Sequence, residues 1–414
     1  MVTSGRLALY IIAVCCYGRR VRDALVATGR VLREACWLAA ERLRWRGDPS
    51  DIPAHAASIT PGWLTRILQP YFPGCRVRSL EQIAADAGTT DRARLAVTYD
   101  DLGSGDPPPA SLFVKLAPAD FKTRLLVNLM RLGATEVAFY RQVAAWLPVD
   151  TPRVFYAHSQ GRAQRFILVL EDLSARAVRF TTVAQALTLD DARVVMQALA
   201  RLHAHLWDSP RFNGDLAWLK SRDHNPNERV ERCLCALAMR PGIRRFPDLV
   251  PRELQAATGR IAAARARLEN AWAHGPLTVI HGDAHVGNLY FSSGTAGFLD
   301  WQVVQRGQGM RDVAYFVINS VPTELRRAHQ RDLIALYLST LAEHGVSGPD
   351  PETAWQQYRL HALYTWIATV VTAAAATLQV EPIVRAGLAR SSHAVMDLDS
   401  LGALDEVLRL PSVG

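Results

Sequence analysis

Lysine is almost missing from this chain of 414 residues, and cysteine is scarce. Only three of the 47 basic residues are lysines, at positions 115, 122 and 220, so a lysine that falls inside an apolar run stands out. The six cysteines are irregularly spaced and form no CxxC pair. This excludes a secreted disulfide scaffold and a cysteine-based structural zinc site, and we expect a reduced, cytoplasmic compartment.

Long apolar runs are also lacking at the N-terminus, where the run over residues 7–17 is too short to span a bilayer as a helix. Residues 1–46 carry +6 of the net charge of +8, so the rest of the chain is nearly neutral and no nucleic-acid partner is expected. Apolar residues recur at helical spacing over 21–43 and predict a basic amphipathic helix. We expect it to pack on the body of the protein. The alternative is weak peripheral membrane contact through residues 1–46, which would make the chain membrane-associated.

The body divides into a strand-rich part and a helical part, so the fold class is α+β. Three domains are expected: an N-terminal extension over 1–50, a first lobe over 51–170 and a second lobe over 171–414. The first lobe has a short helix from Thr60-Pro61 to residue 68 and a helix over 134–146. Its strands are expected at 76–84, 92–99, 111–116, 153–158 and 165–170. Long helices are expected at 190–207, 251–273, 324–344 and 353–378.

One non-helical segment, residues 278–302, interrupts those helices and carries the polar residues of interest. An apolar strand leads to His281-Gly282-Asp283, Asn288 follows, and a further strand ends at Asp300. Phosphoryl transfer from ATP needs oxygen ligands for Mg²⁺ and a carboxylate near the acceptor hydroxyl. His281 and His285 could instead belong to a metal-dependent hydrolase that uses the H-x-D-x-H segment.

The spacing H-x-D-x-x-x-x-N followed by a metal-binding aspartate resembles the catalytic loop of kinases. With glycine after the histidine and Asp-Trp-Gln at 300–302, the chain is similar to the aminoglycoside phosphotransferase and choline kinase-like superfamily. Gln302 and the Glu-Asp-Leu at 171–173 most resemble the ecdysteroid kinase-like branch. The resemblance implies a bilobal protein-kinase-like fold with a small strand-rich lobe and a large helical lobe.

The same resemblance implies a role for each matched position. Asp283 would orient or deprotonate the acceptor hydroxyl, and Asn288 and Asp300 would hold Mg²⁺. Lys115 would contact the phosphates of ATP and pair with Glu136. The set also includes structural and hinge positions: Gly88 and Thr89 in the phosphate loop, Glu171 at the hinge, His281 as a brace of the loop, and Asp312 as a structural aspartate.

The predicted function is therefore a Mg²⁺- and ATP-dependent phosphotransferase that acts on a hydroxyl of a small molecule. An apolar alcohol, a sugar and an aminoglycoside-like compound are the candidate acceptors. The alternatives are the metal-dependent hydrolase and a non-catalytic, nucleotide-binding kinase relative. His203 and His205 lie among leucines at helical spacing and are expected to be packing residues.

Overall fold

The computed structural model describes residues 21–44, 52–103, 105–221, 228–375 and 379–410. The chain forms two compact units. Unit 1 consists chiefly of Leu25–Trp146 and Thr151–Val178, and unit 2 consists chiefly of Leu147–Asp150 and Arg179–Gly414. Unit 1 is built around a β-sheet and unit 2 around helices, which confirms the α+β class and the strand-rich and helical parts of a protein-kinase-like fold. The domain limits at residues 50 and 170 stay a prediction.

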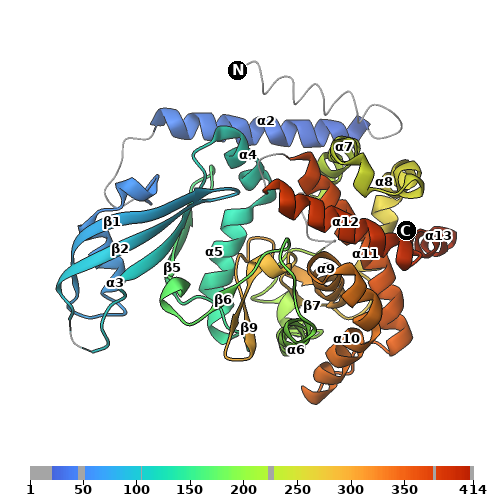
Figure 1. Cartoon of the computed structure of the whole chain (residues 1–414). Helices are drawn as coiled ribbons and strands as arrows, with labels where there is room; N and C mark the ends of the chain where they lie inside the picture. The colour runs from blue at the N-terminus through green and yellow to red at the C-terminus, as the bar shows by residue number, and fades with distance from the viewer. Residues whose placement is uncertain (1–20, 45–51, 104, 222–227, 376–378, 411–414) are drawn as a thin grey trace. The chain divides into compact units, whose positions relative to one another are not determined.

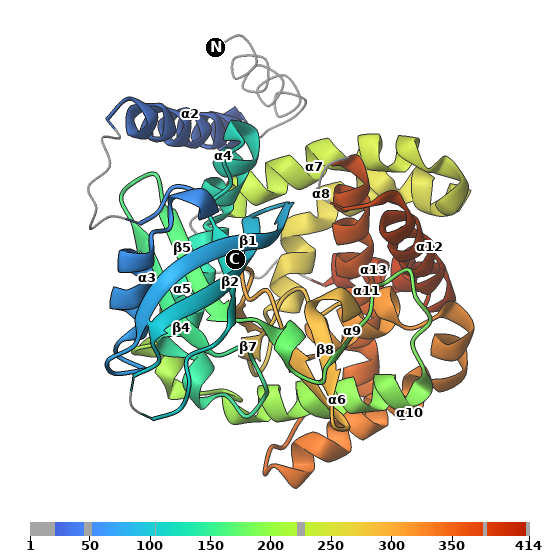
Figure 2. The ribbon, with the colours of Figure 1, turned by 60° about the vertical axis from the view of Figure 1, so that its left-hand side comes forward.

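The sheet of unit 1 is antiparallel and has five strands in the order β1-β2-β3-β5-β4 (Figures 1 and 2). All five strands were expected, and each lies within a few residues of its predicted bounds. They are β1 (Arg76–Ala87), β2 (Asp91–Asp101), β3 (Ser111–Leu116), β4 (Val154–Gln160) and β5 (Arg165–Glu171).

The two faces of this sheet have different partners. Leu112, Val114 and Leu116 of β3 point to one face, where they join a core with the helix α3 (Pro61–Leu68). The side chain of Thr60 accepts a hydrogen bond from the amide of Trp63, so α3 begins at the predicted N-cap. Because side chains alternate along a strand, Lys115 points to the opposite face.

That opposite face is covered by helix α5 (Leu132–Gln142), which follows α4 (Phe121–Met130). The single helix expected over 134–146 is wrong in two respects, because an additional helix precedes it and α5 ends at residue 142. Arg131 separates the two helices with a φ of 58°, a left-handed conformation that interrupts the α-helical run. Gly133, two residues further on, is the nearest helix-weakening residue, but the left-handed residue is Arg131 itself.

The predicted N-terminal helix is present as α2 (Val21–Arg44). Ala27, Val31 and Leu38 are buried along one side of it. Near its end, Glu41 forms ion pairs of 3.4 Å with Arg124 and 2.9 Å with Arg165, both of unit 1. Residues 1–20 and 45–51 lie outside the described residues. The apolar run over residues 7–17, on which the membrane alternative depends, is among them. Among the helices that the structure describes, none is long and apolar enough to cross a membrane.

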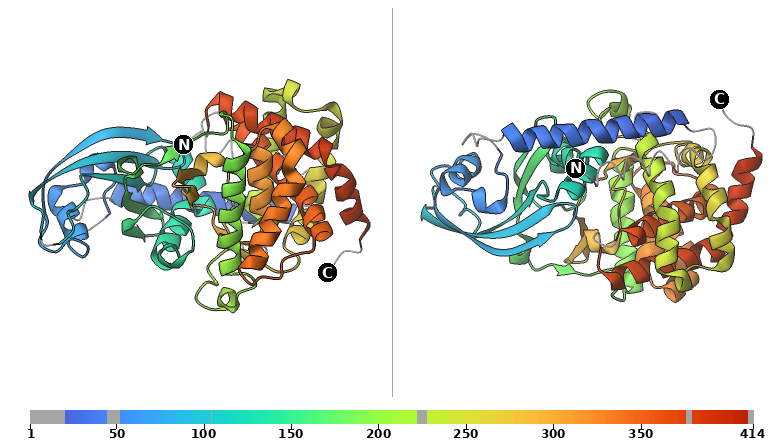
Figure 3. Two further views of the ribbon diagram at one scale, coloured as in Figure 1. Left: turned by 60° about the horizontal axis from the view of Figure 1, so that its bottom comes forward. Right: turned by 90° about the horizontal axis from the view of Figure 1, so that it is seen from above.

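Unit 2 is a set of packed helices, with α6 against α10 and with α9, α12 and α7 around α11 (Figure 3). The four helices predicted here are α6 (Leu189–His205), α8 (Arg252–Trp272), α10 (Thr323–Glu343) and α11 (Pro351–Ala374). Four further helices were not predicted: α7 (Glu228–Arg245), α9 (Met310–Ser320), α12 (Glu381–Asp397) and α13 (Ser400–Arg409). Nearly every residue of α9 is buried, including the polar Asp312, Asn319 and Ser320.

The non-helical segment of unit 2 forms two small sheets. Strand β7 (Thr278–Ile280) pairs with β10 (Gln305–Gly307), and β8 (Leu289–Ser292) pairs with β9 (Thr295–Phe298) and with β6 (Arg179–Phe180). The segment from residue 281 to 288 connects β7 to β8, and Asp300 follows β9 by two residues. The polar residues of interest therefore lie in loops anchored at both ends by strands.

Candidate active site

The loop after β7 is held by a buried carboxylate. Asp312, on the first turn of α9, accepts hydrogen bonds from the amides of His281 (2.6 Å) and Gly282 (2.9 Å). Burial by itself would raise the pKa of Asp312, but the hydrogen bond and charge of His203, with these amides, hold that pKa below its ordinary value. The ionised carboxylate thus fixes the loop at the position expected for a structural aspartate.

Gly282 has the left-handed φ of 84°, and a Cβ there would lie 2.5 Å from the carbonyl oxygen of Val303. Only glycine fits both the conformation and the close backbone approach. This tight turn sends the next residue, Asp283, out of the strand direction.

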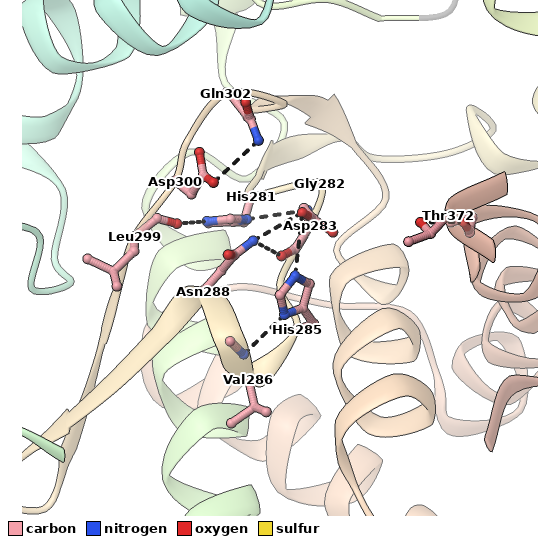
Figure 4. A network of polar contacts seen from close by, with 12 residues as sticks. His281, Gly282, Asp283, His285, Val286, Asn288, Leu299, Asp300, Gln302 and Thr372 are labelled. Atoms are coloured by element: carbon pink, nitrogen blue, oxygen red, sulfur yellow. Dashed lines mark hydrogen bonds and ion pairs between the residues drawn. The ribbon is translucent and has the colours of Figure 1, made fainter. Parts of the chain in front are cut away.

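His281 uses both of its ring nitrogens inside the loop (Figure 4). Its Nε2 donates to the carbonyl of Leu299 at 2.7 Å, and its Nδ1 accepts from the amide of Asp283 at 3.3 Å. These two bonds require the neutral ring, and burial lowers the pKa of His281 accordingly. No ring nitrogen remains to bind a metal ion, so the structure does not support a hydrolase site built on the H-x-D-x-H segment.

Asp283 lies beside Asn288 at the other end of the loop (Figure 4). The Nδ2 of Asn288 donates to the Oδ2 of Asp283 at 3.0 Å and to its backbone carbonyl at 2.9 Å. His285 Nε2 is 3.7 Å from the same carboxylate, while its Nδ1 accepts from the amide of Gly287 at 3.0 Å. The ring of Tyr315 on α9 lies 6.4 Å from that of His285, and burial together with the charge of Asp283 raises the pKa of Tyr315 well above its ordinary value.

Asp300 lies in the loop after β9 with a φ of 60°. Its Oδ2 accepts from the Nε2 of Gln302 at 3.3 Å, and the backbone carbonyl of Asn288 accepts from the amide of Leu299 at 2.8 Å. These bonds hold Asp300 next to the loop that carries Asp283 and Asn288, as Figure 4 shows. Because the nitrogen of the Asn288 amide is engaged with Asp283, its oxygen is the atom suited to a metal ion.

The donor set in unit 2 is thus one carboxylate and one amide oxygen, both hard ligands. Mg²⁺ commonly takes one or two protein oxygens and completes its octahedron with water and phosphate oxygens, so Asn288 and Asp300 fit this ion. Among the described residues, no group of three or more His, Cys, Asp or Glu side chains could hold a metal ion.

Unit 1 contains the predicted lysine–glutamate pair. The Nζ of Lys115 is 2.7 Å from the Oε1 of Glu136 on α5, and the two residues are only 4% and 0% exposed. A buried ammonium requires such a partner because an unpaired charge at this depth is strongly unfavourable. The face alternation of β3 and the position of Glu136 on the covering helix bring the two together.

The other predicted residues of unit 1 lie at the ends of strands. Gly88 and Thr89 form the turn between β1 and β2, where the amide of Gly88 donates to the carbonyl of Thr90 at 3.0 Å. Glu171 is the last residue of β5, and its carboxylate accepts from the amide of Arg153 at 3.2 Å and is 3.7 Å from Arg176. Glu171 is thus engaged within unit 1.

Tyr315 and Arg311, both of α9, were not found from the sequence. Tyr315 lies beside His285, and Tyr364, one of the aromatic residues of the last helices that suit an apolar acceptor, lies beside both Tyr315 and Arg311. His203 is fully buried, as expected of a packing residue, and its ring also lies 2.9 Å from the hydroxyl of Tyr337 and 3.4 Å from Asp312. His205 is exposed, so the same expectation is wrong for it. A four-residue spacing on α9 is the one sequence signal for Arg311 and Tyr315, and it becomes visible once α9 is recognised as a helix.

Comparison with solved structures gives distant likenesses. An aminoglycoside 3′-phosphotransferase of type VIII is 21% identical, with 72% of this chain and 97% of that chain covered and a TM-score of 0.39. A choline kinase from Cryptosporidium parvum is 14% identical (84% and 99% covered, TM-score 0.45), and one from Streptococcus pneumoniae is 13% identical (81% and 98%, TM-score 0.42). No match was found among curated proteins.

Comparison with protein-family models is more decisive. Residues 84–361 match the model of the phosphotransferase enzyme family. This range includes the strand lysine, its glutamate, the loop of Asp283 and Asn288, and Asp300. The match covers about two thirds of the chain, and the chain belongs to the phosphotransferase enzyme family.

Proposed function

We propose that this protein transfers the γ-phosphate of ATP to a hydroxyl group of a small molecule. The observation that carries the proposal is the loop in which Asp283 is held by Asn288, with Asp300 next to it. A fixed carboxylate beside two hard oxygen ligands is the arrangement that phosphoryl transfer requires. Family membership supports the same class of reaction.

In this proposal Asp283 accepts a hydrogen bond from the acceptor hydroxyl and takes its proton as the bond to phosphorus forms. Asn288 keeps the carboxylate in one orientation, so little reorganisation is needed. Asn288 Oδ1 and the Asp300 carboxylate would hold Mg²⁺, which neutralises charge on the phosphates when bound. His281 stays neutral and ties the loop to Leu299.

Lys115 of unit 1 would contact the phosphates of ATP, and Glu136 would keep its ammonium group in place. The turn with Gly88 and Thr89 would cover the phosphates through backbone amides, although it has a single glycine. Glu171 and the residues after it would serve as the adenine-binding hinge. The buried 2.7 Å ion pair is the support for the first of these roles.

For the acceptor we propose an alcohol with a largely apolar body, in line with the resemblance of Gln302 and residues 171–173 to the ecdysteroid kinase-like branch. Aminoglycosides are polycations that need an acidic pocket, and the chain outside residues 1–46 is nearly neutral. Sugars and aminoglycosides remain in the test as comparison acceptors.

The test is a measurement of acceptor-dependent ADP formation by the full chain with MgATP. Asp283→Asn should lower the rate about 10²- to 10⁴-fold, because a positioned carboxylate is lost, while nucleotide binding by calorimetry stays within a few fold. Asp332→Asn, a change at an exposed carboxylate on α10, is the matched control and should keep the wild-type rate.

Two results would contradict the proposal. An Asp283→Asn variant with the wild-type rate would remove this residue from the reaction. MgATP binding by a wild-type chain that forms no ADP with any alcohol, sugar or aminoglycoside would favour the non-catalytic, nucleotide-binding alternative.

A further inference from the structure

Arg311 lies one helical turn from Tyr315 on α9. Residues four apart project from the same side of a helix, so Arg311 shares a side with Tyr315. The Tyr315 ring lies 6.4 Å from that of His285, whose Nε2 is 3.7 Å from the Asp283 carboxylate. The ring of Tyr315 lies 6.0 Å from that of Tyr364 on α11, and Arg311 contacts Tyr364 directly. The three side chains form a continuous group that begins beside His285.

The partners of Arg311 are all uncharged. Its Nη2 donates to the hydroxyl of Tyr364 at 2.5 Å, its Nη1 donates to the Oε1 of Gln305 at 3.0 Å, and its guanidinium carbon lies 3.9 Å from the centre of the Tyr364 ring. Its Nε is buried and has no hydrogen-bond partner. In the part of the chain that the structure describes, no carboxylate lies within ion-pair distance of Arg311.

Two other arginines of unit 2 pair with carboxylates: Arg265 is 2.6 Å from Glu269, and the fully buried Arg326 contacts Asp397. Among the residues that the structure describes, Arg390 also lacks a carboxylate partner, but it donates to three backbone carbonyls, a set that Arg311 does not have. A partly buried cation without an anion is unfavourable, because the solvent it has lost is not replaced by an opposite charge. An anion from outside the chain would complete the environment of Arg311.

Tyr364 adds a second donor to this group. Arginine has no acceptor, so the hydroxyl oxygen of Tyr364 accepts from Arg311 and its own hydrogen remains available to donate. A guanidinium and a phenol hydroxyl side by side are well suited to the oxygens of a carboxylate or a phosphate.

We propose that Arg311 and Tyr364 bind an anionic group of the acceptor, a carboxylate or a phosphate, while its hydroxyl lies at Asp283. This assignment rests on the proposed function and names the class of its acceptor: an anionic rather than a cationic alcohol. The one-turn spacing on α9 places the anionic group roughly 5–8 Å from the reacting hydroxyl.

The test uses three probes that share one skeleton and differ in charge: 4-(hydroxymethyl)benzoate, 1,4-benzenedimethanol and 4-(aminomethyl)benzyl alcohol. Binding of each to the full chain with MgADP is measured by calorimetry, and ADP formation with MgATP is measured in parallel. The variants are Arg311→Gln and Tyr364→Phe. The control is Arg331→Gln, since Arg331 lies over the ring of Trp355 at the same 3.9 Å but on a different part of unit 2.

We expect the benzoate to bind at least about tenfold more tightly than the other two probes, in line with a charge-assisted hydrogen-bond pair. Arg311→Gln should remove this advantage and leave the neutral probe within about twofold. Tyr364→Phe should weaken the benzoate by a few fold and keep the order, because the stacked ring remains. Arg331→Gln should bind all three probes as the wild type does.

The inference is overturned if the neutral or the cationic probe binds as tightly as the benzoate, or if no probe binds. It is also overturned if Arg311→Gln changes only the melting temperature, as a purely structural arginine would. If Arg311→Gln does not fold, a Tyr364→Phe variant that binds the benzoate as tightly as the wild type does is enough to reject the inference. Failure of the phosphotransferase proposal looks different: ADP formation is then absent or insensitive to Asp283→Asn, whatever the order of binding.

Discussion

His361, on α11, is a neutral histidine locked into the interior of unit 2. Its Nε2 lies 2.7 Å from the Oε1 of Gln308, whose own nitrogen donates to the carbonyls of Ala271 and His274. The histidine must therefore be the donor, and its buried Nδ1 has no hydrogen-bond partner. Burial first, and the charge of Arg311 second, lower the pKa of His361 to about 3.

This histidine should make the protein less stable in acid. The unfolded chain takes up a proton near its ordinary pKa of about 6.5, whereas the folded chain does so only near 3. The contribution of the neutral His361 to the free energy of unfolding is fully present above pH 6.5 and is lost progressively as the pH falls toward 3. Thermal unfolding between pH 7.5 and 4.5 measures the effect, and His361→Gln, which keeps a donor to Gln308, should flatten the profile.

His329→Gln is the control for this measurement, since His329 is partly exposed on α10 and should leave the pH dependence as it is. A His361→Gln profile that falls as steeply as that of the wild type would show that other groups cause the acid sensitivity.

At the scale of elements, the loop from residue 281 to 288 depends on one glycine and one aspartate. Gly282 gives the backbone its left-handed turn beside Val303, and Asp312 holds the two amides that precede Asp283. The loop is anchored by β7 on one side and by β8 on the other. Its geometry thus comes largely from the Gly282 turn and from the Asp312 carboxylate, neither of which belongs to the proposed reacting group.

Gly282→Ala should therefore disturb the site more than it disturbs the fold. The added Cβ would lie 2.5 Å from the Val303 carbonyl, so the loop has to move and Asp283 moves with it. Gly294→Ala is a close control, because Gly294 has a similar φ of 77° in the β8–β9 turn but nothing within 4 Å of the added carbon. We expect Gly282→Ala to lower the rate of ADP formation about 10-fold or more, which is the size of loss that a misplaced catalytic group causes. Gly294→Ala should not lower it.

Both variants place an alanine in the left-handed conformation, which typically lowers the free energy of unfolding by about 1 kcal/mol. Their rates are therefore compared after thermal unfolding has shown that the two variants lose similar stability. Equal rates for the two alanine variants would show that the approach to Val303 does not control the position of Asp283.

These elements also show how far the sequence alone leads. The strands of unit 1 and the spacing from His281 to Asp300 could be predicted, because alternation and motif spacing are local properties. Helix α9 was not predicted, although Arg311, Asp312 and Asn319 fall on one side of it, and with it Arg311 and Tyr315 were missed. The break at Arg131 and the bonds of His203 depend on tertiary contacts. The catalytic, metal and nucleotide roles stay predictions.

At the scale of the whole molecule, α2 adds a long helix to unit 1 from Leu25 onward. Leu38 is 2% exposed, whereas Leu32 on the same helix is 49% exposed. Together with the ion pairs of Glu41 to Arg124 and Arg165, this favours a helix that packs on the protein over one that lies on a lipid surface.

Leu38→Ala should lower the free energy of unfolding by about 2–5 kcal/mol, and Leu32→Ala should change it by less than about 0.5 kcal/mol. Deletion of residues 1–46 should likewise lower the melting temperature, and neither chain should sediment with anionic vesicles. Denaturant unfolding and vesicle sedimentation at low and high salt measure the two effects. Salt-sensitive sedimentation of the full chain, with equal stability of both leucine variants, would support the membrane alternative instead.

The scarcity of lysine has a consequence for covalent labelling. A reagent for primary amines finds three lysine side chains: Lys122 is exposed, Lys220 is partly exposed, and Lys115 is buried against Glu136. Because an ammonium held in an ion pair is a poor nucleophile, the adduct on Lys115 forms last. The mass of the intact chain, read over time, thus separates into a few resolved steps, and the slowest of them reports directly on the opening of the Lys115–Glu136 pair.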